Sequence, residues 1–308
     1  MIQDMMTVGG QVISLFLLIS IGVVCAKIRL LSEVAVKAMA NVVLYIATPC
    51  VIIKSCIREF DSALLWGFLA VVAIAAASHL LLVLVARLCY GGQPEQRRRV
   101  LRCATVFSNA GYMAIPLQQA ILGDTGVFYC AAYVIVFNVF LWTYGLVEMS
   151  GEKKMSPRRI LLNPGVIAVA VGLVLFLLPI PVPAPITAAI EHMAALNTPL
   201  PMLIIGYHLA NSNLLTALKD GSAWQCMALR LVGMPLLLLG LLLLCGVRGD
   251  LLTSVMICIA TPVATSCTMF ATRYDCQPTL SVNLVSVSTL LSAFTIPMMV
   301  ALANYLGA

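Results

Sequence analysis

The sequence predicts an all-α integral membrane protein, with ten transmembrane helices arranged as a 5+5 inverted repeat. Three observations carry this prediction: the composition, ten long apolar segments, and two of these segments interrupted at matching places. The chain has 308 residues, of which 62% are hydrophobic and only 10% are charged, whereas soluble domains carry about 25% charged residues. A chain of this composition cannot cover a surface exposed to water, so we expect it in a lipid bilayer.

Ten segments have the length of a spanning helix, which needs about 20 mostly apolar residues. In chain order, as spans 1 to 10, they lie at about 9–27, 34–54, 63–88, 100–122, 126–148, 161–179, 186–210, 222–246, 250–272 and 279–305. None of the loops between them is long enough to hold a soluble domain.

Basic residues in the short loops predict the orientation, because Lys and Arg stay on the cytoplasmic side. With the N-terminus outside, fourteen of them fall on the inward side: Lys27, Arg29, Lys37, Arg87, Arg97, Arg98, Arg99, Arg102, Lys153, Lys154, Arg158, Arg159, Lys219 and Arg273. Three fall outside: Lys54, Arg58 and Arg248. Both termini are therefore expected to be extracytoplasmic, and the net charge of +6 requires no nucleic acid partner. The arginines at 97–99 also suit contact with anionic lipids.

Spans 4 and 9 contain residues that interrupt a helix. Val106–Gln118 reads VFSNAGYMAIPLQ, and Ile259–Ala271 reads IATPVATSCTMFA. Proline removes a backbone donor and clashes with the carbonyl four residues earlier. In hydrocarbon each unpaired backbone group costs several kcal/mol, so a broken helix must be buried in protein or line a watery cavity.

The two halves of the chain also repeat each other. Ala47-Thr48-Pro49 in span 2 and Asn197-Thr198-Pro199 in span 7 lie 150 residues apart, and the broken spans have a similar offset. Five spans in each half force the halves into opposite orientations, which is an inverted-topology repeat. We expect the repeats at 1–154 and 155–308, joined by the basic loop 150–159.

The interrupted spans supply the candidate binding residues. A half-helix that begins after a break presents free N–H groups and a positive dipole end, and two such ends form an anion site without a buried charge. The alternative is a kinked helix whose own Ser and Thr side chains satisfy the backbone. The candidates are Asn109, Gly111, Tyr112, Pro116, Thr261, Pro262, Thr265 and Ser266.

Three further polar residues lie within spans. His79 is suited to a proton relay, since intramembrane ionisable residues are functional by default, or to a neutral hydrogen bond within the bundle. Asn138 in span 5 either lines the site or joins two helices. Arg230 in span 8 is expected to reach the cytoplasmic interface by snorkelling, with anion binding as the alternative. The 11 cysteines form no CxxC pair, and we expect no metal and no cofactor.

Several motifs resemble those of the auxin efflux carrier family. SNAGYMAIPL in span 4 is similar to the family signature SN-x-G-[FY]-x-G-x-P, and matching stretches run over nearly the whole chain. They are NPGVIAVAVGLVL in span 6, LPMLIIGYHLA in span 7, TPVAT and ATRY in span 9, and STLLSAFTIPM in span 10. Ala114 stands where the family often has glycine, and the long central cytoplasmic loop is missing, so the chain looks like a compact prokaryotic member.

The resemblance implies a fold like that of the bile acid symporters. Spans 4 and 9 would cross at their prolines, spans 1, 2, 6 and 7 would form a scaffold, and spans 3–5 and 8–10 a mobile transport part. It maps Asn109 and Pro116 to one side of the crossing and Pro262 to Ser266 to the other. Plant PIN-FORMED members export auxin, whereas bacterial members are linked to malate, malonate and other organic acids, which argues against auxin as the substrate here.

These observations lead to a functional hypothesis: a secondary carrier that moves a small organic anion, such as a dicarboxylate, across the bacterial inner membrane by alternating access. The alternatives are a uniporter or channel, and a receptor of the same fold that transports nothing. No motif of an enzyme is present. Because no span holds a buried carboxylate for sodium, we expect sodium-independent transport, either uniport or proton-linked. The expected partners are the anion and the lipid bilayer, and a homodimer is left open.

Overall fold

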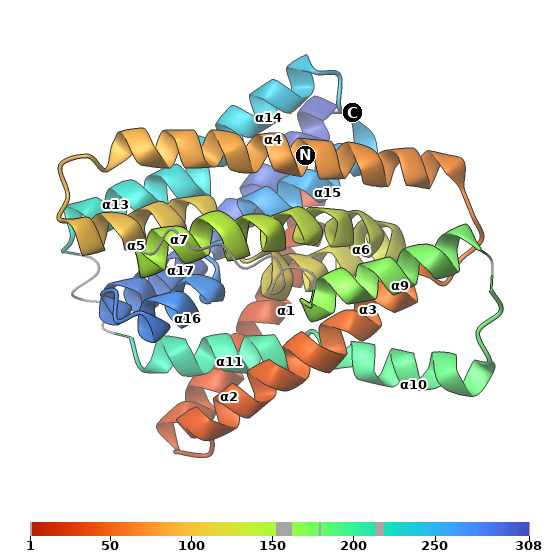
Figure 1. Ribbon diagram of the computed structural model, residues 1–308, viewed down its shortest axis with the longest axis horizontal. Helices are drawn as coiled ribbons and strands as arrows, with labels where there is room; N and C mark the ends of the chain where they lie inside the picture. Colours follow the sequence, from red (N-terminus) through yellow and green to blue (C-terminus); the bar gives the residue numbers. More distant parts are fainter. Residues whose placement is uncertain (1, 152–161, 179, 213–218, 308) are drawn as a thin grey trace.

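The computed structural model describes residues 2–151, 162–178, 180–212 and 219–307 (Figure 1), and within these ranges the chain is helical and contains no β-strand. Among them, seven helices are long and apolar enough to cross a membrane: Val8–Lys27, Glu33–Cys56, Ser62–Cys89, Ala110–Ser150, Ala184–Ala210, Gly221–Leu244 and Pro278–Gly307. Pro164–Leu177 and Gly249–Ala260 are shorter apolar helices. The prediction of a multi-pass α-helical membrane protein is confirmed at this level.

The first half of the chain forms ten helical elements. They are α1 (Ile2–Lys27), α2 (Glu33–Val42), η1 (Val43–Ala47), α3 (Thr48–Cys56), α4 (Ser62–Cys89), α5 (Glu95–Val106), η2 (Ala110–Ala114), α6 (Ile115–Phe140), η3 (Leu141–Gly145) and α7 (Leu146–Ser150). Two of these helices have a side-chain cap at their amino end. Ser32 accepts a hydrogen bond from the Ala35 N–H at the start of α2, and Asp61 accepts one from the Ala63 N–H at the start of α4. Both are N-caps, which satisfy donors that a helix end leaves open.

The second half forms nine described elements. They are α9 (Pro164–Leu177), α10 (Ala184–Ala195), α11 (Pro199–Ala210), α13 (Gly221–Ala228), η4 (Leu229–Gly233), α14 (Met234–Leu244), α15 (Gly249–Ala260), α16 (Thr265–Arg273) and α17 (Pro278–Gly307). The predicted boundary between the repeats, together with Lys153, Lys154, Arg158 and Arg159, lies outside the described residues.

The loop predicted between spans 4 and 5 is a kink inside α6. Gly123 has φ 62° and ψ −148°, a conformation that glycine adopts without a steric penalty. The helix on its two sides therefore changes direction where the sequence predicts one span to end and the next to begin.

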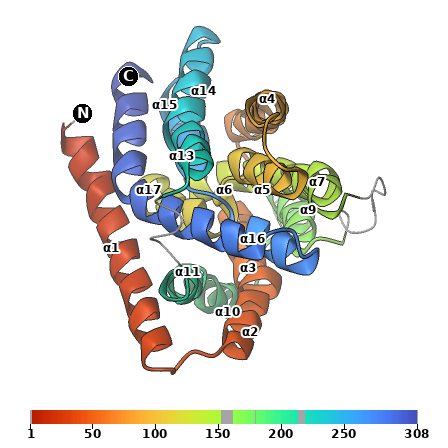
Figure 2. The same cartoon turned by 90° about the vertical axis from the view of Figure 1, so that its left-hand side faces the viewer.

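Helix α1 lies along one flank of the molecule, next to α11 and α17 (Figure 2). A Cβ on Gly22 would lie 2.6 Å from the carbonyl oxygen of Leu203, and one on Gly206 would overlap the carbonyl of Ile19. The backbones of α1 and α11 thus touch directly, the kind of packing that small residues allow between membrane helices.

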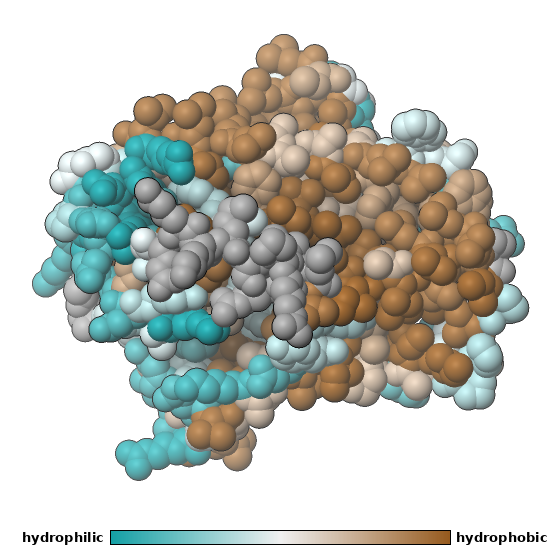
Figure 3. Space-filling view, in the orientation of Figure 1, coloured by the Kyte–Doolittle hydropathy of each residue, from teal (hydrophilic) through white to brown (hydrophobic). Residues whose placement is uncertain are grey.

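Polar residues gather at one end of an otherwise apolar face. Figure 3 shows hydrophilic side chains over the end at which α5 and α13 begin and along the lower edge near α2 and α11, and a broad hydrophobic surface over the upper and right-hand part of the view. Arg97 of α5 is paired there with Asp220 and donates to the Ser222 hydroxyl at 3.1 Å. These contacts tie α5 to α13 at the end that the basic residues predict to be cytoplasmic.

Candidate functional site: the crossing of two interrupted helices

The two interrupted segments meet in the interior as a short antiparallel bridge between Ser108 and Val263. The Asn109 N–H donates to the Pro262 carbonyl at 2.8 Å, and the Ala264 N–H donates to the Phe107 carbonyl at 2.9 Å. Each break therefore supplies partners for the other. Backbone groups that lose their helical partners in an apolar environment are thereby paired across the crossing.

Arg230 of η4 completes the crossing on the side where α5 and α15 end. Its side chain is fully buried, and its guanidinium donates to the carbonyls of Thr105 at 3.1 Å, Thr261 at 3.4 Å, and Ile259. The expectation that Arg230 snorkels to the interface is wrong, because three carbonyls that the breaks leave without helical partners hold it inside the protein.

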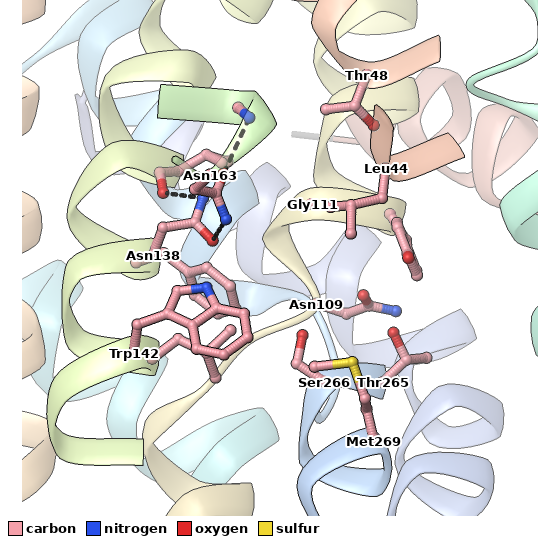
Figure 4. Close-up of a pocket in the computed structure, with 15 residues that line it drawn as sticks. Leu44, Thr48, Asn109, Gly111, Asn138, Trp142, Asn163, Thr265, Ser266 and Met269 are labelled. Carbon is pink, nitrogen blue, oxygen red and sulfur yellow. Dashed lines mark hydrogen bonds between the residues drawn. The ribbon is translucent and has the colours of Figure 1, made fainter. Parts of the chain in front are cut away.

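A cavity of about 100 Å³ opens on the other side of the crossing, where η2 and α16 begin (Figure 4). Since one water needs roughly 10–15 Å³ by this measure, the cavity has room for a small organic molecule. Six of the predicted residues line it: Asn109, Gly111, Tyr112, Asn138, Thr265 and Ser266. The other lining residues are Leu44, Thr48, Val134, Phe137, Leu141, Trp142, Asn163, Gly165 and Met269.

Among the described residues, the polar groups that line this cavity are neutral, since they include no Lys, Arg, Asp or Glu. Neither η2 nor α16 has a side-chain cap at its amino end, so their first N–H groups and positive dipole ends are available to a ligand. Asn109 is 3% exposed, and its Nδ2 has no hydrogen-bond partner among the described residues. An unpartnered buried donor at two helix amino ends suits a carboxylate.

Asn138 faces this group across the cavity (Figure 4). It donates through Nδ2 to the Val134 carbonyl at 2.9 Å, and its Oδ1 accepts from Asn163 Nδ2 at 3.3 Å. Asn163 in turn caps α9 by accepting from the Gly165 N–H at 2.9 Å. Asn138 therefore joins two helices and lines the cavity at the same time.

The remaining predicted residues lie elsewhere. Thr261 and Pro262 are buried in the crossing itself, where their carbonyls are used. Pro116 lines a second cavity of about 180 Å³, together with Lys54, Glu191 and Asn197. The Thr48 hydroxyl, in the lining of the first cavity, donates to Asn197 Oδ1 at 2.7 Å, so one hydrogen bond joins the two linings.

His79 lies behind the first cavity and does not line it. Its ring is fully buried, with Nδ1 2.8 Å from the Ala75 carbonyl. The ring packs against Phe140 and Tyr133, with centroids 5.0 and 5.4 Å away, and against Phe137 of the cavity lining. Since a carbonyl only accepts, Nδ1 carries the proton, and Nε2 has no partner among the described residues.

Sequence reasoning missed Thr48, Trp142 and Asn163 as lining residues. Thr48 and Asn163 each precede a proline in a motif that was noted for another reason, Ala-Thr-Pro as a repeat and Asn-Pro-Gly as a family motif. Asn before a helix-starting proline is a signal for a cap, and Asn163 does cap α9, whereas Thr48 lies inside the continuous helix Glu33–Cys56 and caps nothing. Trp142 carries no such signal.

Comparison with models of protein families identifies a match over most of the chain. A family model described as "Membrane transport protein" matches residues 7–155 and again residues 152–300. Together the two matches reach from the first predicted span to the last. No curated protein matches the chain.

Proposed function

Because the chain belongs to the auxin efflux carrier family of membrane transport proteins, we propose that it is a secondary carrier for a small organic anion. Its membership confirms the resemblance carried by the motifs, and its length suits a compact prokaryotic member. The family is one of transporters and not of enzymes.

One observation carries the proposal: the first cavity lies at the amino ends of two half-helices, and it contains the unpartnered amide of Asn109. A carboxylate placed there would accept hydrogen bonds from this amide, from the Thr265 and Ser266 hydroxyls, and from free backbone N–H groups. Charge-assisted bonds of this kind are about twice as strong as neutral ones. A dicarboxylate of malonate size is the first ligand to try.

The proposed architecture is ten spans in two inverted repeats. Several features support it: α6 turns at Gly123, α15 and α16 flank one break as α5 and η2 flank the other, and the two termini lie close together in both views (Figures 1 and 2). An even number of crossings puts both termini on one side. The basic loops make that side extracytoplasmic, in the inner membrane of a bacterium.

Transport by alternating access requires one part of the molecule to move against another. We assign α1, α2, α3, α9, α10 and α11 to the scaffold, and the remaining described helices to the transport part. The first cavity is lined from both parts, by Thr48 and Asn163 on the scaffold and by Asn109 and Thr265 on the transport part. A ligand between the parts changes its contacts when they shift, which is what a carrier needs.

Flux measurements on purified protein in liposomes test the proposal. A carrier gives uptake of a labelled dicarboxylate that saturates with concentration and is accelerated by unlabelled substrate on the opposite side. Flux without saturation or counterflow indicates a channel, and saturable binding without flux indicates a receptor. Either result would refute the carrier. Cross-linking in native membranes tests whether the carrier is a homodimer.

A further inference from the structure

Building on the proposed anion site, we infer that Arg230 is the positioning residue that makes the crossing selective for anions. The two breaks each remove helical hydrogen bonds. In an unbroken helix, Thr105 O would accept from the Asn109 N–H, and Ile259 O would accept from the Val263 N–H. These two donors bond instead to the Pro262 carbonyl, at 2.8 Å, and to the Ser288 hydroxyl, at 3.1 Å.

The two carbonyls released in this way bond to the same guanidinium. Arg230 Nη1 reaches Thr105 O and Nη2 reaches Ile259 O, while Nε reaches Thr261 O. In each half-helix, the carbonyl that lost its partner is the one four residues before the N–H that would have donated to it. The Arg230 guanidinium donates to that carbonyl in both. Only arginine presents its donors in a rigid planar fork that spans carbonyls from separate segments.

The charges of the helix ends and of Arg230 determine the electrostatic potential in the first cavity. The carboxyl end of a helix carries roughly −0.5 elementary charge and the amino end roughly +0.5. Two carboxyl ends, those of α5 and α15, meet at Arg230, whose single positive charge is of the size needed to balance them. The amino ends of α16 and of the helix formed by η2 and α6 face the first cavity, where no lining residue in the described part of the chain is charged.

Without Arg230, the negative ends would lie directly behind the cavity and oppose the positive ends that line it. With Arg230, the cavity experiences the amino ends alone. The arginine therefore favours an anion without touching it, which explains how a buried cation contributes to a site that it does not line. It also ties both half-helices to η4, so the crossing moves as one unit with the α13–η4–α14 rod.

A cysteine introduced into the cavity lining reports the electrostatic potential there, because a positive potential favours its thiolate. Ser266 is half-buried in the lining, and Ser266→Cys places a titrating sulfur at the amino end of α16. The background replaces the exposed and half-buried cysteines Cys25, Cys50, Cys89 and Cys245 by alanine. The rate of alkylation by neutral iodoacetamide at pH 7.5 then reports the thiolate fraction, because only the thiolate reacts.

Arg230→Gln, which keeps donors for the carbonyls but removes the charge, should slow this alkylation by about threefold or more. Arg230→Lys, which keeps the charge, should stay close to the parent rate. Arg248→Gln is the matched control. Arg248 also donates to two carbonyls, those of Leu243 and Val247, but it lies in an exposed loop. The alkylation rate of the introduced cysteine should not change in this variant. At a pH where the thiol is fully ionised, all rates should agree, which separates the field from access to the sulfur.

Equal slowing by Arg230→Gln and Arg230→Lys, or no slowing by Arg230→Gln, would overturn the inference. Failure of both variants to fold would assign Arg230 to packing alone and overturn it as well. Because the probe is part of the protein, the outcome does not depend on which anion is carried. If no flux is found but Arg230→Gln slows alkylation of the introduced cysteine, the carrier proposal is refuted and the role of Arg230 is retained.

Discussion

Replacing Asn109 by alanine should weaken anion binding without destabilising the protein. The Asn109 side chain makes no hydrogen bond with another described residue, whereas its backbone N–H and C=O, which alanine keeps, bond to Pro262 O at 2.8 Å and to the Met113 N–H at 2.9 Å. The substitution therefore removes a donor aimed at a ligand and none of the bonds that hold the crossing together.

The magnitude follows from the bond that the ligand loses. A hydrogen bond to a charged group contributes about 1.5–3 kcal/mol net, and each 1.4 kcal/mol is a factor of ten in affinity. The dissociation constant of Asn109→Ala should rise roughly ten- to hundredfold. Asn109→Asp should abolish binding, since it places a second carboxylate beside the first.

Asn138→Ala is the matched control, because Asn138 bonds to Val134 O at 2.9 Å and to Asn163 at 3.3 Å. It should lower the melting temperature and change affinity less than Asn109→Ala does. The assay measures both quantities on each purified variant, with a carboxylate selected by thermal-shift screening of dicarboxylates and other weak acids. An Asn109→Ala protein with parental affinity and a lower melting temperature would mean that Asn109 only braces the break.

Three further predictions concern topology, coupling and packing. A cysteine placed after Ala308 in a cysteine-free background should react with an impermeant maleimide in intact cells; reaction only after permeabilisation would reverse the predicted orientation. Uptake should persist when choline replaces sodium, and if transport is proton-linked, His79→Gln should flatten its pH dependence at unchanged expression; an unaltered profile would exclude His79 from coupling. Gly206→Ala should cost about 1–3 kcal/mol of stability, because its Cβ would overlap the carbonyl of Ile19, whereas Gly240→Ala, with no atom within 4 Å of its Cβ, should cost little; equal melting temperatures would contradict this packing.

The membrane class and the helical segments could be predicted because both follow from local physics. Apolar length predicts a span directly, and seven helices of the described chain are long and apolar enough to cross a membrane; the arrangement as ten spans remains a prediction. The details that were harder to foresee depend on tertiary context. Gly123 turns α6 without ending its hydrogen bonding, and no local sequence rule distinguishes such a kink from the loop predicted there.

The candidate site was predictable where a polar residue stands next to a helix break. Asn109, Thr265 and Ser266 meet that description, and they line one cavity. Pro262 lies in the break between α15 and α16, and Pro116 lies in the first turn of α6. Neither lines this cavity, and a proline contributes no backbone donor. Thr48 and Asn163 come from helices whose position against the crossing is a matter of packing, which the sequence does not encode locally.

The environment of Arg230 could not be predicted from the sequence, because it depends on segments that are far apart in the chain. An arginine within a span suggests snorkelling when its distance from the membrane surface is the only information. The alternative becomes visible once Thr105, Ile259 and Thr261, which lie up to 156 residues apart in the chain, present their carbonyls at one point. Burying this cation is tolerable because those carbonyls are themselves unpaired ends of helices, so each group supplies what the other lacks.

The same charge balance bears on the substrate. With the negative ends matched by Arg230, the two amino ends that face the first cavity present roughly one positive elementary charge, which is the charge that one carboxylate neutralises. The lining residues that the structure describes offer no charged side chain to a second carboxylate, and the amides of Asn138 and Asn163 across the cavity provide hydrogen bonds without charge. If the proposed substrate is a dicarboxylate, we therefore expect it to bind with one carboxylate at the crossing and the other protonated or in contact with water. The net charge of the ligand, more than its length, should then govern affinity.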